Sequence, residues 1–384
     1  MLVNTKKKRL VMLKRVLVIT FAVVLNIAAS GFADEVVDGR VGDSVYRLVR
    51  PTNWNGRLVL YAHGFVPSDA PVVLPPEGSL LISLLVPQGF AVAYSSFSEN
   101  GWAVRDGAER THQLLGIFSA RFGRPERVYI TGVSMGGLIA IKLSETYPGI
   151  YAGALPAGAV AGGARRQFDY EANIWTLFDF LYPEVLPSDA ANVPAGIDVT
   201  QAVVLPALAA MEANPSGAFA MAQIDQIPIP FSTAAELVES ILTALAYYAM
   251  EFTDLSDRTH GHGFFDNSDT QYTGSLPPEQ LQAINAGIQR FAASADALNY
   301  LEHFYNPSGA LRIPMLMLAT SRDPVVPGFH QIAYRDAVAA AGASDFLVQR
   351  EIDRYGHLTF APEELSQAFS DLVLWVEFGV KPVP

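Results

Sequence analysis

The chain of 384 residues contains no cysteine. This absence excludes thiol nucleophiles, iron–sulfur clusters and zinc sites built from thiolates. It also excludes disulfide bonds and cysteine-linked lipid anchors, so an exported form depends on packing alone. Charged residues are sparse, at 17%, against 50% apolar residues. That composition is typical of globular domains, and at this length we expect two domains or one large domain with an insertion.

Positive charge is scarce beyond the first 33 residues. Six of the 26 Lys and Arg side chains precede the first acidic residue, Asp34, which leaves 20 basic side chains against 38 acidic ones. An acidic body of this kind repels phosphate backbones, so we expect no nucleic-acid partner.

Long hydrophobic runs are also missing, apart from a short one near the start. The six basic residues are followed by a mostly apolar run over residues 16–29 and then by the small residues Gly31 and Ala33. This order predicts a secretory signal peptide over residues 1–33, and hence a secreted or periplasmic protein with no stable membrane insertion after cleavage. The alternative is an uncleaved membrane anchor, although a membrane span needs about twenty apolar residues and this run is shorter.

Strand patterns alternate with helical patterns in both terminal parts of the chain. Apolar runs predict strands at 45–49, 58–62, 91–95, 128–131, 152–157, 315–319 and 347–352, and apolar residues at helical spacing predict helices at 104–122, 136–147 and 362–378. Continuous apolar runs are expected of strands buried on both faces. The alternation predicts an α/β fold with a mostly parallel sheet covered by helices.

The alternation stops between residues 158 and 311. Pro and Gly divide this stretch into helical segments, of which Thr233 and Glu236 predict a capping box at the start of one. We therefore expect core segments at 34–157 and 312–384, joined by a large helical insertion over 158–311.

A strand-to-helix turn carries the pattern Gly-x-Ser-x-Gly. Gly132, Ser134 and Gly136 follow a predicted strand directly, and a helical pattern begins after them. A turn this tight brings the strand and the helix close together. Only small residues therefore fit at the positions two before and two after the serine. The Ser134 hydroxyl would then project at the carboxyl edge of the sheet, where α/β proteins bind ligands. We predict that Ser134 is a nucleophile.

A serine nucleophile needs a base, and the base needs an acid to orient it. His357 and Asp323 each follow a predicted strand, so both lie in loops at the same sheet edge as Ser134. We predict His357 as the base and Asp323 as the orienting acid. Asp353 competes as the acid, but the acid normally comes from a separate loop, which favours Asp323.

Acyl transfer also needs N–H donors for the oxyanion that develops. A predicted strand leads into His63-Gly64-Phe65, a glycine turn that lets the backbone approach the serine. We predict that the backbone N–H groups of Phe65 and Met135 form the oxyanion hole. For His63, a role in shaping this loop is favoured over a catalytic one.

The insertion leaves the core after the predicted strand 152–157, at the edge that carries Ser134. We therefore expect a helical cap over the site, and the alternative is packing on the flank of the core. Within the insertion, the segment 198–213 and the pair Tyr247 and Tyr248 are apolar enough to line a substrate pocket, and core packing explains them equally well.

His260 and His262 could chelate a metal ion, but two histidines in a Gly-rich loop without a third ligand are more typical of a simple loop. No metal and no other cofactor is predicted.

The combination of these motifs resembles the α/β-hydrolase superfamily, in which the triad follows the chain order Ser, Asp, His. The motifs that carry the resemblance are His63-Gly64-Phe65, Gly132-Val133-Ser134-Met135-Gly136, Asp323 and Gly356-His357. The likeness is closest to secreted bacterial esterases and prolyl-oligopeptidase-like hydrolases, to which residues 51–56 and 263–267 also look similar. It covers both ends of residues 40–384 and matches the insertion only weakly. The His-Gly-Gly-Gly signature of one esterase branch is absent, so nothing is carried over from that branch.

The resemblance implies hydrolysis of a carboxylic ester, small or oligomeric, through an acyl-enzyme formed on Ser134. His357 would act as base and then as acid, and Asp323 would hold the imidazole. The sequence carries no signal for the oligomeric state.

Two other functions stay open at this point. A serine peptidase of the prolyl aminopeptidase or oligopeptidase type would use the same three residues. An aminopeptidase also needs an acidic clamp for the substrate amine, and the insertion offers Glu171, Asp179, Glu236 and Glu239. A binding protein that kept the fold is the third possibility, and the intact triad argues against it.

Overall fold

The computed structural model describes residues 34–384, so the predicted signal peptide lies outside the described residues. The described chain forms two compact units. A sheet unit comprises the residues up to Gly163, His303–Ser321 and Gly328–Pro384, and a helical unit comprises Ala164–Glu302 and Arg322–Pro327. Among the described residues, no helix is both long enough and apolar enough to cross a membrane.

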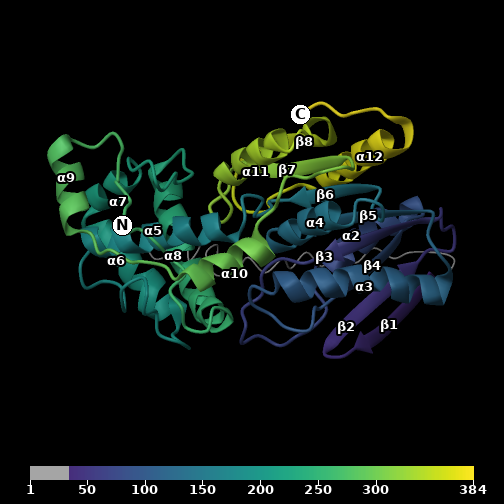
Figure 1. Ribbon diagram of the computed structural model, residues 1–384, viewed down its shortest axis with the longest axis horizontal. Coiled ribbons are helices and arrows are strands. Elements are labelled where there is room, and N and C mark those ends of the chain that lie inside the picture. The colour runs from purple at the N-terminus through teal and green to yellow at the C-terminus, as the bar shows by residue number, and fades with distance from the viewer. Residues whose placement is uncertain (1–33) are drawn as a thin grey trace, which may run out of the picture. The chain divides into compact units, whose positions relative to one another are not determined.

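The sheet unit is built on strands in the order β1-β2-β4-β3-β5-β6-β7-β8 (Figure 1). Their bounds are Glu35–Val41 (β1), Ser44–Arg50 (β2), Arg57–Ala62 (β3), Ala91–Ser95 (β4), Arg127–Val133 (β5), Gly153–Ala157 (β6), Met315–Arg322 (β7) and Leu347–Tyr355 (β8). Strand β3 pairs in parallel with β4 and β5, β5 with β6, and β6 with β7, whereas the hairpin β1–β2 joins β4 in antiparallel fashion. The mostly parallel sheet confirms the predicted fold class.

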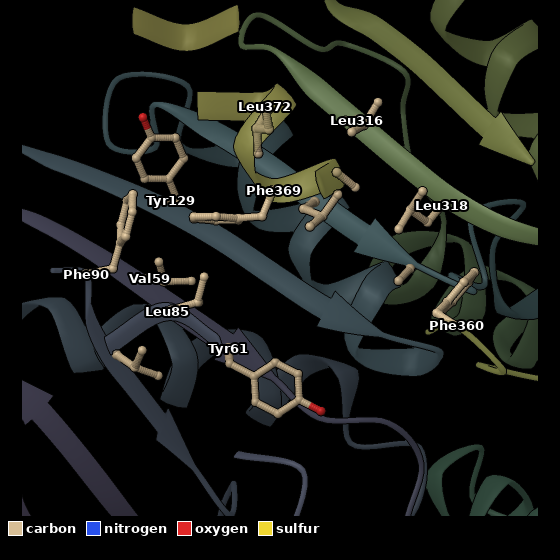
Figure 2. Close-up of a cluster of buried hydrophobic side chains, with 14 of the residues drawn as sticks. Val59, Tyr61, Leu85, Phe90, Tyr129, Leu316, Leu318, Phe360, Phe369 and Leu372 are labelled. Carbon is tan, nitrogen blue, oxygen red and sulfur yellow. The ribbon is translucent and has the colours of Figure 1, made fainter. Parts of the chain in front are cut away.

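Helices pack against this sheet, and two of them contribute side chains to its main hydrophobic core. The helices are Gly78–Leu85 (α2), Val104–Phe122 (α3), Met135–Thr146 (α4), Phe329–Ala340 (α11) and Pro362–Phe378 (α12). Buried side chains of α2 and α12 form one cluster with those of the strands. In that cluster Phe369 meets Phe90 and Tyr129 edge to face, with ring centroids 5.1 and 5.6 Å apart (Figure 2). Aromatic pairs favour this arrangement.

One strand and two α-helices of the sheet unit were not predicted from the sequence. Strand β1 is an edge strand that contains Asp38-Gly39, a pair more typical of turns, and all of its residues are exposed or half-buried. The predicted helices 104–122 and 362–378 are confirmed to the residue. Helices α2 and α11 were missed; α2 is a short run of apolar residues, whose periodicity does not separate a helix from a strand.

Ion pairs cross the β1–β2 hairpin at the outer edge of the sheet. The guanidinium of Arg47 donates two hydrogen bonds of 2.7 Å to the carboxylate of Asp38, and Arg50 lies 2.7 Å from Glu35. The hydrogen bond from Arg47 holds the pKa of Asp38 below its usual range. Paired charges thus lie along the edge strand.

Between β6 and β7 the chain is helical. The helices are Ala164–Leu181 (α5), Leu205–Ala213 (α6), Pro215–Met221 (α7), Ala234–Arg258 (α8), Pro278–Gly287 (α9) and Ala295–Tyr305 (α10), and a π-helical turn covers Thr200–Val204. Thr233 caps α8, because its side chain accepts a hydrogen bond from the backbone N–H of Glu236. The Glu236 carboxylate accepts from the N–H and hydroxyl of Ser232, which differs from the predicted reciprocal bond to Thr233. The insertion bounds of 158 and 311 and the cap role stay predictions.

A buried carboxyl pair lies between α5 and α8. Glu171 is 1% exposed and Glu251 is 2% exposed, and the two carboxyl groups interact directly. The amide of Gln167 donates a 2.6 Å hydrogen bond to Glu171. Burial raises the pKa of Glu171 far above its usual range, because a charged carboxylate loses its hydration there. Burial therefore favours the protonated form of the Glu171 carboxyl group in the folded protein.

Replacing this carboxyl by an amide should change how stability depends on pH. The unfolded chain releases the Glu171 proton near pH 4.5, whereas the folded chain keeps it to higher pH. The free energy of unfolding should therefore fall as pH rises above this value. We expect Glu171→Gln to raise the midpoint of thermal unfolding more at pH 8 than at pH 5. The exposed Glu279→Gln is the control, and an equal shift at both pH values would contradict the expectation.

Candidate active site

The turn at Ser134 has the strained geometry that its sequence predicts. Strand β5 ends at Val133, helix α4 begins at Met135, and Ser134 between them has φ 55° and ψ −124°. A non-glycine residue with positive φ is held there by its surroundings. A Cβ atom at Gly132 would overlap the carbonyl of Gly136, and the prediction that only small residues fit is confirmed.

The close approach of α4 to β3 gives a testable expectation. A Cβ atom at Gly136 would overlap the backbone oxygens of Ala62 and His63, which cannot move aside as a flexible side chain could. We expect Gly136→Ala to lower the free energy of unfolding by about 3 kcal/mol or more, measured by urea denaturation. Gly149→Ala is the matched control, since a Cβ atom there meets nothing within 4 Å. Equal losses in the two variants would contradict this account.

His357 lies close to the turn that carries Ser134. The N–H of Ser134 donates a 3.0 Å hydrogen bond to the carbonyl of Ala157, at the end of β6. The next residue is Gly158, and a Cβ atom there would lie 3.3 Å from Cε1 and 3.5 Å from Nδ1 of His357. Ser134 and His357 are both buried, at 9% and 7% exposed. The structure therefore brings the predicted nucleophile and base to the same edge of the sheet.

The backbone on either side of His357 is held in a defined conformation. The hydroxyl of Thr320, in β7, donates a 2.7 Å hydrogen bond to the carbonyl of Gly356. Gly356 has φ 115°, and Leu358 has φ 54°, a value that costs a leucine about 1–2 kcal/mol. Such strain at a non-glycine residue persists only where surrounding contacts impose it. Sequence reasoning missed Gly158 and Leu358, because their contacts with each other and with His357 do not follow from a local motif.

Asp323 lies in the tight turn that follows β7. It is 1% exposed, and its Oδ1 accepts hydrogen bonds from the N–H groups of Val325 and Val326, at 2.9 and 3.0 Å. By its contacts this turn groups with the helical unit, where Gln167 donates a 2.8 Å hydrogen bond to the carbonyl of Val325. The pairing of Asp323 with His357 stays a prediction.

The competing acid, Asp353, has a different environment. It is exposed on β8, and its carboxylate accepts a 3.1 Å hydrogen bond from the hydroxyl of Ser321. That hydroxyl in turn accepts a 3.2 Å hydrogen bond from the N–H of Arg354. Asp353 therefore helps to join β7 to β8.

The loop after β3 passes directly over Ser134. A Cβ atom at Gly64 would lie 3.3 Å from the Cβ of Ser134, so the backbone approaches the nucleophile as predicted. The His63 ring stacks on Phe97, with centroids 3.8 Å apart, and its Nδ1 lies 2.8 Å from the carbonyl oxygen of Gly64. Burial lowers the pKa of His63 to about 4. The imidazole is therefore neutral at pH 7, and because a carbonyl only accepts, Nδ1 must carry the proton.

This hydrogen bond orients one of the two predicted oxyanion donors. In a trans peptide the C=O and the following N–H point in opposite directions. Holding the carbonyl of Gly64 toward His63 therefore aims the N–H of Phe65 away from that ring. The loop-shaping role predicted for His63 is confirmed by this contact. The second donor, Met135, is the first residue of α4, where an N–H has no acceptor within the helix.

The remaining candidates lie in the helical unit. His260 and His262 are in an exposed loop, and the described residues contain no group of three metal-ligating side chains that could hold an ion. Tyr248 is buried in α8 and donates a 2.5 Å hydrogen bond to the carbonyl of Ala190. It lines a hollow of about 100 Å³ with Phe252 and Phe264.

Two of the acidic candidates for an amine clamp have partners within the helical unit. Glu171 pairs with Glu251, as described above. Glu236 accepts from Ser232 and lies 3.7 Å from Arg322. Asp179 is half-buried, and this burial raises the pKa of its carboxyl group.

Comparison with known proteins finds similar chains among solved structures alone. No protein-family model and no curated protein matches the chain. Among solved structures it is similar to feruloyl esterase B from Aspergillus oryzae, at 14% identity and a TM-score of 0.53, covering 88% of this chain and 78% of that one. It is also similar to an esterase from Pyrococcus furiosus, at 11% identity and a TM-score of 0.45 over 90% and 95% of the two chains. A further match is brefeldin A esterase, a bacterial homologue of human hormone-sensitive lipase, at 14% identity and a TM-score of 0.44 over 94% and 80%. The chain thus has the α/β-hydrolase fold, as its motifs predicted.

Proposed function

We propose that the protein is a serine hydrolase that cleaves carboxylic esters through an acyl-enzyme. The observation that carries the proposal is the strained Ser134 between β5 and α4, with His357 beside the neighbouring Gly158. A nucleophile on such a turn, with a buried histidine at the same sheet edge, fits the Ser-His-Asp chemistry. The likeness to feruloyl esterase B supports the fold that this chemistry needs.

In the first half-reaction the Ser134 hydroxyl oxygen bonds to the ester carbonyl carbon while His357 takes the hydroxyl proton. The N–H groups of Phe65 and Met135 donate to the oxygen that becomes negative. When the intermediate collapses, the bond to the alcohol oxygen breaks, and His357 gives its proton to the leaving alcohol. The product of this step is an ester on Ser134.

In the second half-reaction a water molecule attacks the acyl-enzyme. His357 takes a proton from the water, the bond between Ser134 and the acyl group breaks, and the proton returns to the serine oxygen. Asp323 holds the imidazole in the required tautomer throughout. Two observations support this role: Asp323 is buried, and Thr320, three residues earlier, bonds to Gly356 beside His357.

A comparison of esters with amides tests the proposal against a peptidase. We expect turnover of p-nitrophenyl esters and none of aminoacyl or prolyl anilides. Faster turnover of the anilides would establish the peptidase instead, and labelling of a residue other than Ser134 by a fluorophosphonate would overturn the mechanism.

We also propose that the protein acts after export, either in the periplasm or in the medium. The basic start and the apolar run at residues 16–29 support removal of residues 1–33. Intact-mass measurement of the exported protein should then give an amino terminus at Asp34. Recovery of the full-length chain from membranes alone would indicate an anchor.

A further inference from the structure

A buried glutamine of α5 connects two parts of the helical unit. Gln167 is 2% exposed, and its amide nitrogen donates a 2.6 Å hydrogen bond to the carboxyl group of Glu171 and a 2.8 Å hydrogen bond to the backbone carbonyl of Val325. A primary amide carries two N–H donors, so each donor has an acceptor here. Because a backbone carbonyl only accepts, the nitrogen of this amide and not its oxygen must face Val325. The neighbours of Gln167 therefore fix how its amide is oriented.

This carbonyl lies in the turn that carries Asp323, residues 323–326, which we call the acid turn. The C=O of Val325 and the N–H of Val326 belong to one planar trans peptide group and point in opposite directions. The C=O accepts from Gln167, and the N–H donates a 3.0 Å hydrogen bond to Oδ1 of Asp323. Gln167 and the Asp323 carboxylate therefore bind opposite edges of the same rigid group. A rotation of that group would move the Val326 donor away from the carboxylate.

The contacts of Gln167 lie in a part of the helical unit from which water is largely excluded. Gln167 and Glu171 are one turn apart in α5, and the carboxyl of Glu171 contacts that of Glu251 in α8. At the other end, Val325 and Asp323 are 5% and 1% exposed. All five residues belong to the helical unit. Loss of the Gln167 donors would therefore take a hydrogen bond from two buried acceptors that water cannot easily reach.

We propose that Gln167 is a positioning residue, which holds the acid turn so that the Asp323 carboxylate keeps the orientation that His357 requires. The inference rests on the proposed function, because it takes Asp323 as the orienting acid. Gln167 is buried and acts through the peptide group of Val325 and Val326, so we expect it not to touch the substrate. The helical unit would then affect the rate of the reaction in a way that is separate from its predicted role as a cap.

The separate effects on kcat and KM test this role. Gln167→Met keeps the length of the side chain close to that of glutamine and removes both N–H donors. We expect kcat for p-nitrophenyl acetate to fall by about tenfold to a hundredfold, because a misplacement of about 1 Å caused far from the reacting atoms can lower the rate by about 10²-fold. KM should stay near the wild-type value. A folded variant with the wild-type kcat would overturn the inference.

The matched control is Asn173→Leu, in the same helix. Asn173 is also a buried amide, 7% exposed, which donates a 2.6 Å hydrogen bond to the carbonyl of Asp169 and accepts one of 2.6 Å from the hydroxyl of Tyr272. Leucine is close to asparagine in shape and removes both bonds, so this variant should lose stability as Gln167→Met does. Its kcat should stay at the wild-type value, because neither bond reaches the acid turn. An equal fall in kcat in the two variants would mean that any disturbance of α5 slows the reaction, and the positioning role would be wrong.

A double variant shows whether Gln167 acts through Asp323. In the Asp323→Asn background the acid is already absent, so Gln167→Met should lower kcat no further. A further tenfold fall would show that Gln167 affects the rate by another route, which overturns the inference. Circular dichroism checks that each variant is folded. If the methionine variant does not fold, Gln167→Asn takes its place, because its amide is shorter by one methylene group and cannot keep both hydrogen bonds, and kcat should again fall with KM unchanged.

The outcomes separate this inference from the proposed function. If Asp323→Asn loses activity and the folded Gln167 variant does not, the positioning role is overturned and the proposed hydrolase mechanism stands. If the wild type does not hydrolyse the ester, the proposed function fails and the positioning role fails with it. Full activity in Asp323→Asn would remove the proposed acid and, with it, the positioning role of Gln167.

Discussion

Ser134→Ala is expected to lower kcat for p-nitrophenyl ester hydrolysis by roughly 10⁶-fold. This change removes only the hydroxyl group. Alanine keeps the Cβ atom that the neighbouring backbone approaches closely. The thermal midpoint should therefore stay near that of the wild type, so the loss of rate would report chemistry. A stable variant that keeps a tenth of the activity would show that another residue is the nucleophile.

His357→Ala is the companion measurement. Because the nucleophile and base act as a unit, the double variant should lose no more than either single variant. Losses that multiply would mean that the two residues contribute independently, and the acyl-enzyme mechanism proposed above would be wrong.

Asp323→Asn should lower kcat by roughly 10⁴, the scale expected when the imidazole loses the acid that fixes its tautomer. The amide is nearly the same size as the carboxylate, and its oxygen can still accept from the N–H groups of Val325 and Val326. The turn should therefore persist, and the free energy of unfolding should change far less than the rate.

Asp353→Asn is the matched control for this acid. Asp353 is exposed and bonds to the Ser321 hydroxyl, which an asparagine oxygen can also accept. We expect kcat to stay close to the wild-type value, because Asp353 is exposed and the substitution keeps its hydrogen bond to Ser321. A large loss in Asp353→Asn together with a small one in Asp323→Asn would reverse the assignment of the acid.

The sequence allowed most of the sheet unit to be predicted, because its elements follow from local patterns. The continuous apolar runs of β3, β4 and β5 mark buried strands, and the two glycines around Ser134 mark the tight turn. The edge strand β1 could not be found in this way, since the turn-like pair Asp38-Gly39 separates its apolar residues in the sequence.

The parts of the site that were missed depend on contacts between distant segments. A Cβ atom at Gly158 would lie 2.7 Å from Cδ2 of Leu358 and 3.3 Å from Cε1 of His357, contacts made across about two hundred residues of chain. The hydrogen bond from Thr320 to Gly356 and the strain at Leu358 are likewise products of the folded chain.

The charges on the outermost strands bear on how the protein behaves at high concentration. An exposed sheet edge offers unpaired N–H and C=O groups on which another chain can build a strand, and charged side chains make that pairing unfavourable. Strand β1 carries Glu35, Asp38 and Arg40, and β8, at the opposite end of the sheet, carries Glu351 and Asp353 on its exposed positions. Both ends of the sheet are thus protected against addition of further strands. A chain without disulfides has no covalent restraint on transient opening of its edges, so these charges are its built-in resistance to aggregation.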